Sequence, residues 1–199
     1  MRFAHCLVAV TVGVTGSAVL FAGPAVTAQP SPSVGLVGDS RLSGQGVDIS
    51  VTIPTGWHQL PDQSQPQLLQ MVYPDTCSAG LQCASALASV LSTQAANSQT
   101  AAKAVEQAVT GQPGVQGATI TSEGPAQVAG RTGYRVRFSY STPTAKFQAE
   151  TAAVQTGPAS SGAAQTSLVF VTVSDLAGAP PPSVIDQIVS SAQLTAREK

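Results

Sequence analysis

Few side chains in this sequence have the chemistry for metal binding or catalysis. The 199 residues include only two histidines and three cysteines. His58 directly follows Trp57, and we interpret it as an exposed turn histidine because no partner at a suitable spacing accompanies it. Asp62 and Asp75 are of the type that works as an acid–base pair, but their spacing does not indicate one. The pattern therefore predicts no metal site, no cofactor and no catalytic residue.

Ser40 is the one candidate nucleophile. It lies in the segment Gly38–Leu42, which resembles the nucleophile block of GDSL-type esterases. A serine nucleophile needs a histidine base within hydrogen-bond reach, and in that family the base lies near the C-terminus. No histidine follows His58 in this chain. A small secreted serine esterase using Ser40 and His58 is therefore the alternative function, and a non-enzymatic role is the leading prediction.

Residues 1–28 have the pattern of a secretory signal peptide. Arg2 supplies one positive charge, an uncharged apolar run extends from Cys6 to Ala22, and Val26 and Ala28 are small residues of the kind that signal peptidase requires. The run is shorter than the ~20 residues of a membrane span. Cleavage near Ala28 is expected, with an uncleaved anchor as the alternative. A lipobox cysteine follows the apolar run and a small residue, whereas Cys6 follows His5 at the start of the run, so it does not form a lipobox. The prediction is a secreted or periplasmic, cell-envelope location.

Cys77 and Cys83 are the cysteines that remain after cleavage. An even pair in an oxidising compartment most often forms a disulfide. A metal site needs two further ligands, and His58 is the one that the cleaved sequence offers. A redox pair usually has the spacing C-x-x-C, which this pair lacks. The prediction is a structural disulfide between Cys77 and Cys83.

Three arginines are grouped around the most regular strand pattern of the chain. Arg135 and Arg137 share one face of that strand, and Arg131 comes just before it. Guanidinium groups bind phosphate, sulfate or carboxylate, so these arginines, together with Trp57, are candidate contacts for a ligand or partner. The alternative is a solvent-facing row paired with acidic neighbours such as Glu150.

The charge content limits the possible partners. Charged residues make up 10% of the chain, against roughly 25% in an average soluble domain. A formal net charge of −1 gives no basic excess to neutralise phosphates, so nucleic acid is not an expected partner. The hydrophobic content of 43% is sufficient for a packed core.

The chain is predicted to contain a single domain. Residues 29–46 are rich in Pro, Ser and Gly and predict a flexible linker, the domain covers 47–195, and 196–199 form a charged tail. Strands are predicted at 47–53, 84–91, 118–123, 134–140, 146–155 and 167–174, with a strand or helical turn at 67–73, a tight turn at 130–133, and helices at 99–110 and 183–193. The strand 167–174 is apolar on both faces and should be central. This order predicts an α+β fold, an antiparallel sheet of about five to seven strands flanked by two helices.

The pattern resembles the PsbP-like superfamily, and more narrowly the secreted LpqN-type lipoproteins of mycobacteria and relatives. The features that carry the resemblance are the strand 47–53 leading into Ile53–Trp57, the hairpin at Val128–Val136, the strand 167–174 and the closing helix 183–193. The resemblance covers about residues 47–195 and implies an α/β/α sandwich. It also implies a non-enzymatic envelope protein that binds a protein partner or a cell-wall lipid. The high Ala, Val, Thr and Gly content fits an actinobacterial source.

Small residues are frequent on the helix 99–110 and on the strand 84–91. A sheet covered by such elements can leave a groove for an acyl chain or for a segment of a partner. We therefore expect a secreted binding module for an envelope lipid or an envelope protein.

Overall fold

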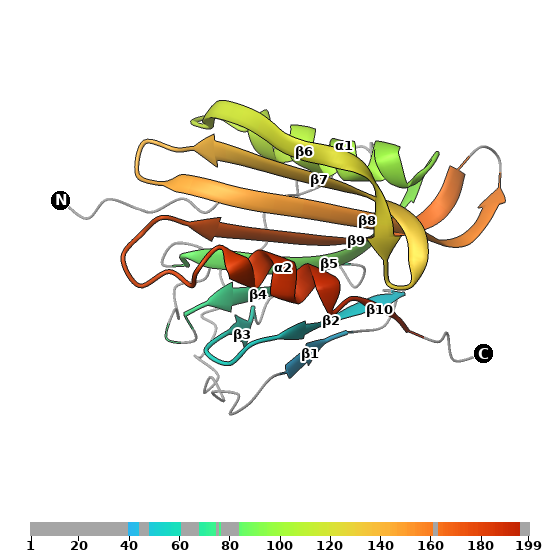
Figure 1. Cartoon of the computed structure of the whole chain (residues 1–199), viewed down its shortest axis with the longest axis horizontal. Coiled ribbons are helices and arrows are strands. Elements are labelled where there is room, and N and C mark those ends of the chain that lie inside the picture. The colour runs from blue at the N-terminus through green and yellow to red at the C-terminus, as the bar shows by residue number, and fades with distance from the viewer. Residues whose placement is uncertain are drawn as a thin grey trace, which may run out of the picture.

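The computed structural model describes residues 40–43, 48–60, 68–74, 76, 84–160 and 163–195. Its elements in chain order are β1 (Ser40–Leu42), β2 (Ile49–Ile53), β3 (His58–Gln59), β4 (Leu68–Tyr73), β5 (Ala86–Ala95), α1 (Ser98–Thr110), β6 (Gln116–Val128), β7 (Arg131–Ser141), β8 (Lys146–Ser160), β9 (Ala163–Ser174), α2 (Ser183–Ser190) and β10 (Gln193–Leu194). Figure 1 shows a broad sheet with α1 and α2 on opposite faces. The predicted α+β class is confirmed.

The main sheet of the described chain has seven strands in the order β3-β4-β5-β9-β8-β7-β6. Every neighbouring pair is antiparallel. β9 lies between β5 and β8, and its residues from Ser167 to Ser174 are all buried. This confirms the prediction of a central strand, because a strand that is apolar on both faces needs cover on both sides.

α1 covers one face of the main sheet. The helix begins after Asn97, whose side-chain oxygen accepts a hydrogen bond from the backbone N–H of Thr100 at 2.8 Å, so an unpaired donor of the first turn is satisfied. The buried stripe of the helix consists of Ala101, Ala102, Val105 and Val109. Four aromatic rings belong to the same core, those of Phe138, Tyr140, Phe147 and Phe170. The helical spacing read from the sequence is thus confirmed.

α2 and a small sheet cover part of the other face. The small sheet has the order β1-β2-β10. Its central strand β2 packs in one core with the buried side of α2 and with β9, through residues such as Val51, Ile188 and Val171. Figure 1 shows α2 lying over β9, and its contacts extend to β8. The two ends of the domain therefore form one layer.

Several boundaries differ from the predicted ones. Residues 40–42 fall in the range expected to be a linker, but they form β1, with Ser40 opposite Ile53 of β2. Backbone hydrogen bonds hold this strand in place, and such bonds do not require a particular pattern of side chains. The turn expected at 130–133 consists only of Ala129 and Gly130, both with positive φ, as two-residue hairpin turns require. β5 and β6 extend beyond 84–91 and 118–123, and α2 ends at Ser190.

Gly133 has a different role from Gly130, although both belong to the same hairpin. Gly133 lies within β7, where β8 approaches closely. A Cβ at this position would overlap the carbonyl oxygen of Ala153 and press on the side chain of Val128. The two glycines of the hairpin thus serve two needs, a positive φ at Gly130 and space at Gly133.

Tyr140 gives the core beneath α1 a pH dependence. Its ring is buried, and its hydroxyl lies 3.2 Å from the hydroxyl of Thr172. Burial raises the pKa of Tyr140 from 10.0 to about 12, and the hydrogen bond with Thr172 offsets part of that rise. The hydroxyl of Tyr140 loses its proton near pH 10 in the unfolded chain and near pH 12 in the folded chain. Its contribution to the free energy of unfolding is therefore complete below pH 10 and is lost as the pH rises through 12. The expected loss is about 3 kcal/mol, measured by urea unfolding across this range.

Tyr140→Phe separates this effect from the titration of other groups. The variant has no phenol at position 140, so its stability should fall less steeply between pH 10 and pH 12 than that of the unmodified protein. Equal slopes for the two proteins would show that Tyr140 does not titrate as described.

Within the described ranges, no helix is both long and apolar enough to cross a membrane.

Candidate functional site

An apolar cleft lies between α1 and the main sheet, at the end where β5 finishes and β9 begins. Its volume is about 330 Å³, at the low end of the roughly 300–1,000 Å³ of small-molecule pockets. The cleft is lined by Leu91, Thr93, Gln94, Ala95, Ala96, Thr100, Ala101, Ala104, Val105, Ala163 and Leu168. None of these side chains carries a charge. We refer to this site as the α1 cleft.

Small side chains keep the α1 cleft open. α1 contributes Ala101 and Ala104 to the lining, and each of these side chains is a single methyl group. Towards the opposite end of the sheet, the same helix–sheet interface is filled by stacked rings, including those of Tyr140 and Phe147, whose centroids are 4.9 Å apart. The hollow therefore arises where the helix contributes alanine and the strands contribute no aromatic ring.

The floor of the α1 cleft is apolar and its rim is polar. Leu168, Val105 and Leu91 form the floor and are 0%, 2% and 7% exposed. Thr100 stands at the rim, where its hydroxyl donates to the side-chain oxygen of Asn97 at 3.1 Å. Such a site favours an apolar group that enters from water without a charge. The groove expected beside the helix 99–110 is present, although its strand side lies at residues 91–96.

The arginine row forms an ion-pair cluster around a buried carboxylate. Glu150 of β8 lies opposite Arg137 of β7 and is only 2% exposed. It accepts hydrogen bonds from Arg135 Nε and, at 2.8 Å, from Arg137 Nε. Arg137 also donates to Asp186 of α2, and Arg135 Nη2 lies 3.9 Å from the same carboxylate. The cluster thus links two strands to α2, and the expected pairing with Glu150 is confirmed.

The charges of this cluster balance, since two guanidinium groups face two carboxylates. Partial burial lowers the pKa of Arg137, but the hydrogen bonds to Asp186 and Glu150 together raise it above its ordinary value. Arg135 and Arg137 are therefore engaged within the protein. Arg131 is exposed, and its guanidinium donates to the backbone carbonyl of Gln155 at 3.4 Å.

Comparison with known proteins identifies the architecture. No family model matches the chain, and no curated protein matches it. The solution structure of cyanobacterial PsbP (CyanoP) from Synechocystis sp. PCC 6803 matches with a TM-score of 0.51 at 13% identity, over 83% of this chain and 97% of that chain. The chain has a PsbP-like fold. The crystal structure of LpqN, involved in cell envelope biogenesis of Mycobacterium tuberculosis, matches with a TM-score of 0.40 at 15% identity, over 79% of this chain and 86% of that chain.

Trp57 lies in the core of the PsbP-like fold. Its side chain is 2% exposed, and its ring centroid is 5.8 Å from that of Tyr73, with the rings tilted by 56°. The same cluster of buried residues includes Val51 of β2 and Ile185 of α2. The structure therefore places this candidate contact residue inside the core, where it packs the α2 layer against the main sheet.

Ser40 and His58 occupy separate strands of the PsbP-like fold. Ser40 lies in β1 opposite Ile53, and His58 lies in β3 opposite Val72. No hydrogen bond between them is found in the part of the chain that the structure describes. His58 is half-buried, not exposed as expected, because β3 pairs with β4; its Nδ1 is buried and has no partner among the described residues.

The remaining candidates of the sequence lie outside the described residues. They are Gly38, Asp39, Asp62, Asp75, Cys77 and Cys83, together with the signal segment 1–28. Among the residues that are described, no three His, Cys, Asp or Glu side chains gather in a way that could hold a metal ion.

Thr151 carries an unpaired hydroxyl in the core of the sheet. The residue is 0% exposed, and its Oγ1 has no hydrogen-bond partner among the described residues. Valine has nearly the same shape and lacks the hydroxyl. Thr151→Val is therefore expected to raise the free energy of unfolding by about 1 kcal/mol, measured by urea unfolding.

Thr172→Val is the matched control, because Thr172 is also 0% exposed but its hydroxyl is bonded to that of Tyr140. This change leaves the tyrosine hydroxyl unpaired and should lower the free energy of unfolding by about 1 kcal/mol. The interpretation fails if both substitutions shift stability in the same direction.

Proposed function

We propose that the protein is a secreted, non-catalytic accessory protein of the cell envelope whose α1 cleft binds the acyl chain of an envelope lipid. The observation that carries the proposal is the cleft itself, an uncharged hollow of about 330 Å³ with an apolar floor. Each Å² of alkyl surface that leaves water for such a floor is worth roughly 25 cal/mol. The polar rim can accommodate the ester or headgroup end of the lipid.

The chemistry of the floor favours an acyl chain over a peptide segment. Leu91, Val105 and Leu168 present only carbon atoms to the hollow. A peptide would bring backbone N–H and C=O groups into the cleft, where these side chains give them no hydrogen-bond partner. An alkyl chain carries no such groups and loses nothing on leaving water.

The pattern of the first 28 residues supports secretion. It combines a positive charge, an apolar run and small residues before Gln29. The resemblance of the residue pattern to LpqN-type lipoproteins supports a role in the envelope. Both features suit a protein that meets lipids outside the cytoplasmic membrane.

The proposal is tested by offering lipids to the purified chain from Gln29 to Lys199. The protein is incubated with a lipid extract of an actinobacterial envelope and examined by native mass spectrometry. We expect a complex with one lipid, whose acyl chain is identified after release. If no lipid is retained, while chemical cross-linking in the envelope captures a tight protein partner, the protein is an adaptor for that partner and the lipid proposal is wrong.

A further inference from the structure

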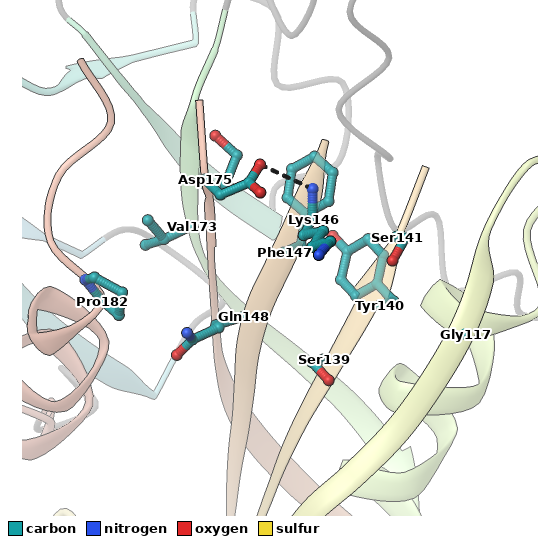
Figure 2. A pocket seen from close by; sticks show the side chains of 11 residues that line it. Gly117, Ser139, Tyr140, Ser141, Lys146, Phe147, Gln148, Val173, Asp175 and Pro182 are labelled. Atoms are coloured by element: carbon teal, nitrogen blue, oxygen red, sulfur yellow. Dashed lines mark hydrogen bonds between the residues drawn. The ribbon is translucent and has the colours of Figure 1, made fainter. Parts of the chain in front are cut away.

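A second hollow lies on the face of the sheet opposite α1, between the ends of β7, β8 and β9 and the segment that precedes α2. Its volume is about 280 Å³, and it is lined by side chains of both polar and apolar type. Figure 2 shows Ser139 and Gln148 on neighbouring strands, with Val173 and Pro182 on the other side of Gln148. We refer to this site as the β7–β8 pocket.

Four polar side chains of the β7–β8 pocket have no partner within the described residues, whereas the hydroxyl of Ser174 donates to the backbone carbonyl of Ser85. The hydroxyls of Ser139 and Ser141, the amide of Gln148 and the ammonium of Lys146 have no hydrogen-bond partner in the described chain. The neighbouring pair on the same face of β7 and β8 is Arg137 and Glu150, and these two side chains bond to each other. The pocket thus collects donors and acceptors that remain available to a ligand.

The charges around the β7–β8 pocket favour a neutral ligand. Lys146 and Asp175 bring one positive and one negative charge to the same rim. Asp175 Oδ1 accepts a hydrogen bond from the backbone N–H of Lys146 at 3.0 Å, the dashed line in Figure 2, which holds the carboxylate at the pocket. An anion would meet this carboxylate and a cation would meet the lysine. A ligand with hydroxyl groups can bond to both without a charge of its own.

The walls of the β7–β8 pocket suit a ring with one apolar side. Pro182 is exposed and presents carbon atoms across from the polar row, while Val173 beside it is buried. Gly117 of β6 stands at the rim, where a Cβ would come to 3.9 Å from Ser141 Oγ, so its lack of a side chain leaves the entrance wide. A sugar ring has hydroxyls at its edge and C–H groups on its faces, which matches this division.

We propose that the β7–β8 pocket binds a neutral saccharide. The serine hydroxyls and Gln148 bond the sugar hydroxyls, and Pro182 packs against the ring. The site lies on the opposite face of the sheet from the α1 cleft, so the proposal goes beyond lipid binding and does not depend on it.

The test is a titration of the ¹⁵N-labelled protein followed by NMR. The probes are glucose, mannose and N-acetylglucosamine, each as the free sugar and as its linear tetramer. We expect at least one probe to shift the side-chain amide signal of Gln148 and the backbone signals of Ser139 and Ser141. Tighter binding of a tetramer than of its free sugar points to a glycan as the source, and equal binding points to a free sugar.

Gln148→Leu should weaken the binding of the responding sugar about five- to tenfold, because it removes hydrogen bonds to the ring. The matched control is Gln107→Leu, the same substitution at an exposed position of α1, which should leave sugar binding unchanged. Shifts confined to other regions, no shift with any sugar, or a stronger response to inorganic phosphate would overturn the proposal. Lipid binding in the α1 cleft is measured in a separate experiment, so the lipid proposal and the saccharide proposal can be rejected independently.

Discussion

Replacing Glu150 with alanine is expected to lower the free energy of unfolding by about 3 kcal/mol. The variant removes the buried carboxylate that accepts hydrogen bonds from both Arg135 and Arg137. Only Asp186, which is 56% exposed, then remains to balance two guanidinium groups. Since the arginine side chains are 29% and 38% exposed, water relieves part of the repulsion and holds the loss at the lower end of the range for broken buried pairs.

Urea unfolding at neutral pH measures this loss, and Asp186→Asn is its control. Asp186 faces solvent from α2, so its neutralisation should change the free energy of unfolding by less than about 1 kcal/mol. A loss for Glu150→Ala no larger than that for Asp186→Asn would mean that the buried carboxylate is not the centre of the cluster.

Ala104→Leu is expected to weaken the binding of a long-chain fatty acid at least about tenfold. Ala104 is an exposed residue of α1 at the α1 cleft, so a larger side chain there occupies the space proposed for the ligand. Leucine is a strong helix former, and the helix itself should be preserved. Displacement of a fluorescent fatty acid from the purified protein measures the affinity.

Gln107→Leu introduces the same side chain at an exposed position of α1 that does not line the cleft. Its affinity for the fatty acid should equal that of the unmodified protein. Undiminished binding by Ala104→Leu, or an equal loss in Gln107→Leu, would show that the ligand binds elsewhere or that any added leucine disturbs the helix.

The elements predicted best are those whose side chains are sorted by burial. β7 was visible because Val136, Phe138 and Tyr140 alternate with polar residues, and one face of this strand is buried under α1. The continuous apolar run of β9 predicts a central strand, because both of its faces are covered. In both strands the burial of each face selects the residue type, so the pattern of residues predicts the strand.

β1 and the burial of Glu150 were not predictable in the same way. β1 has only three residues and is ordered by backbone pairing with β2, which any side chains permit. Glu150 was expected in a solvent-facing pair because a lone glutamate in a strand normally faces water. It pairs with Arg135 and Arg137, and these two arginines also contact Asp186 of α2, 36 residues further along the chain. No local pattern encodes that contact.

The candidate site was predictable in part. The alanines of the helix 99–110 indicated a groove, and the α1 cleft lies there. The sequence pattern favours residues 84–91 as the strand side, whereas β5 extends to Ala95, its register with β9 brings Leu168 opposite Leu91, and the cleft lies at residues 91–96. The β7–β8 pocket gave no signal, since Ser139, Lys146 and Gln148 read as ordinary surface residues until the register aligns them.

The most direct test of lipid binding in the α1 cleft is an intermolecular NOE measurement. The protein is prepared with labelled methyl groups in a deuterated background, and protonated palmitate is added to saturation. The proposed function predicts cross-peaks between the alkyl chain and the methyl groups of Leu91, Val105 and Leu168. Cross-peaks only to methyl groups of the α2 layer, such as Ile185, or no cross-peaks at saturating palmitate, would contradict it.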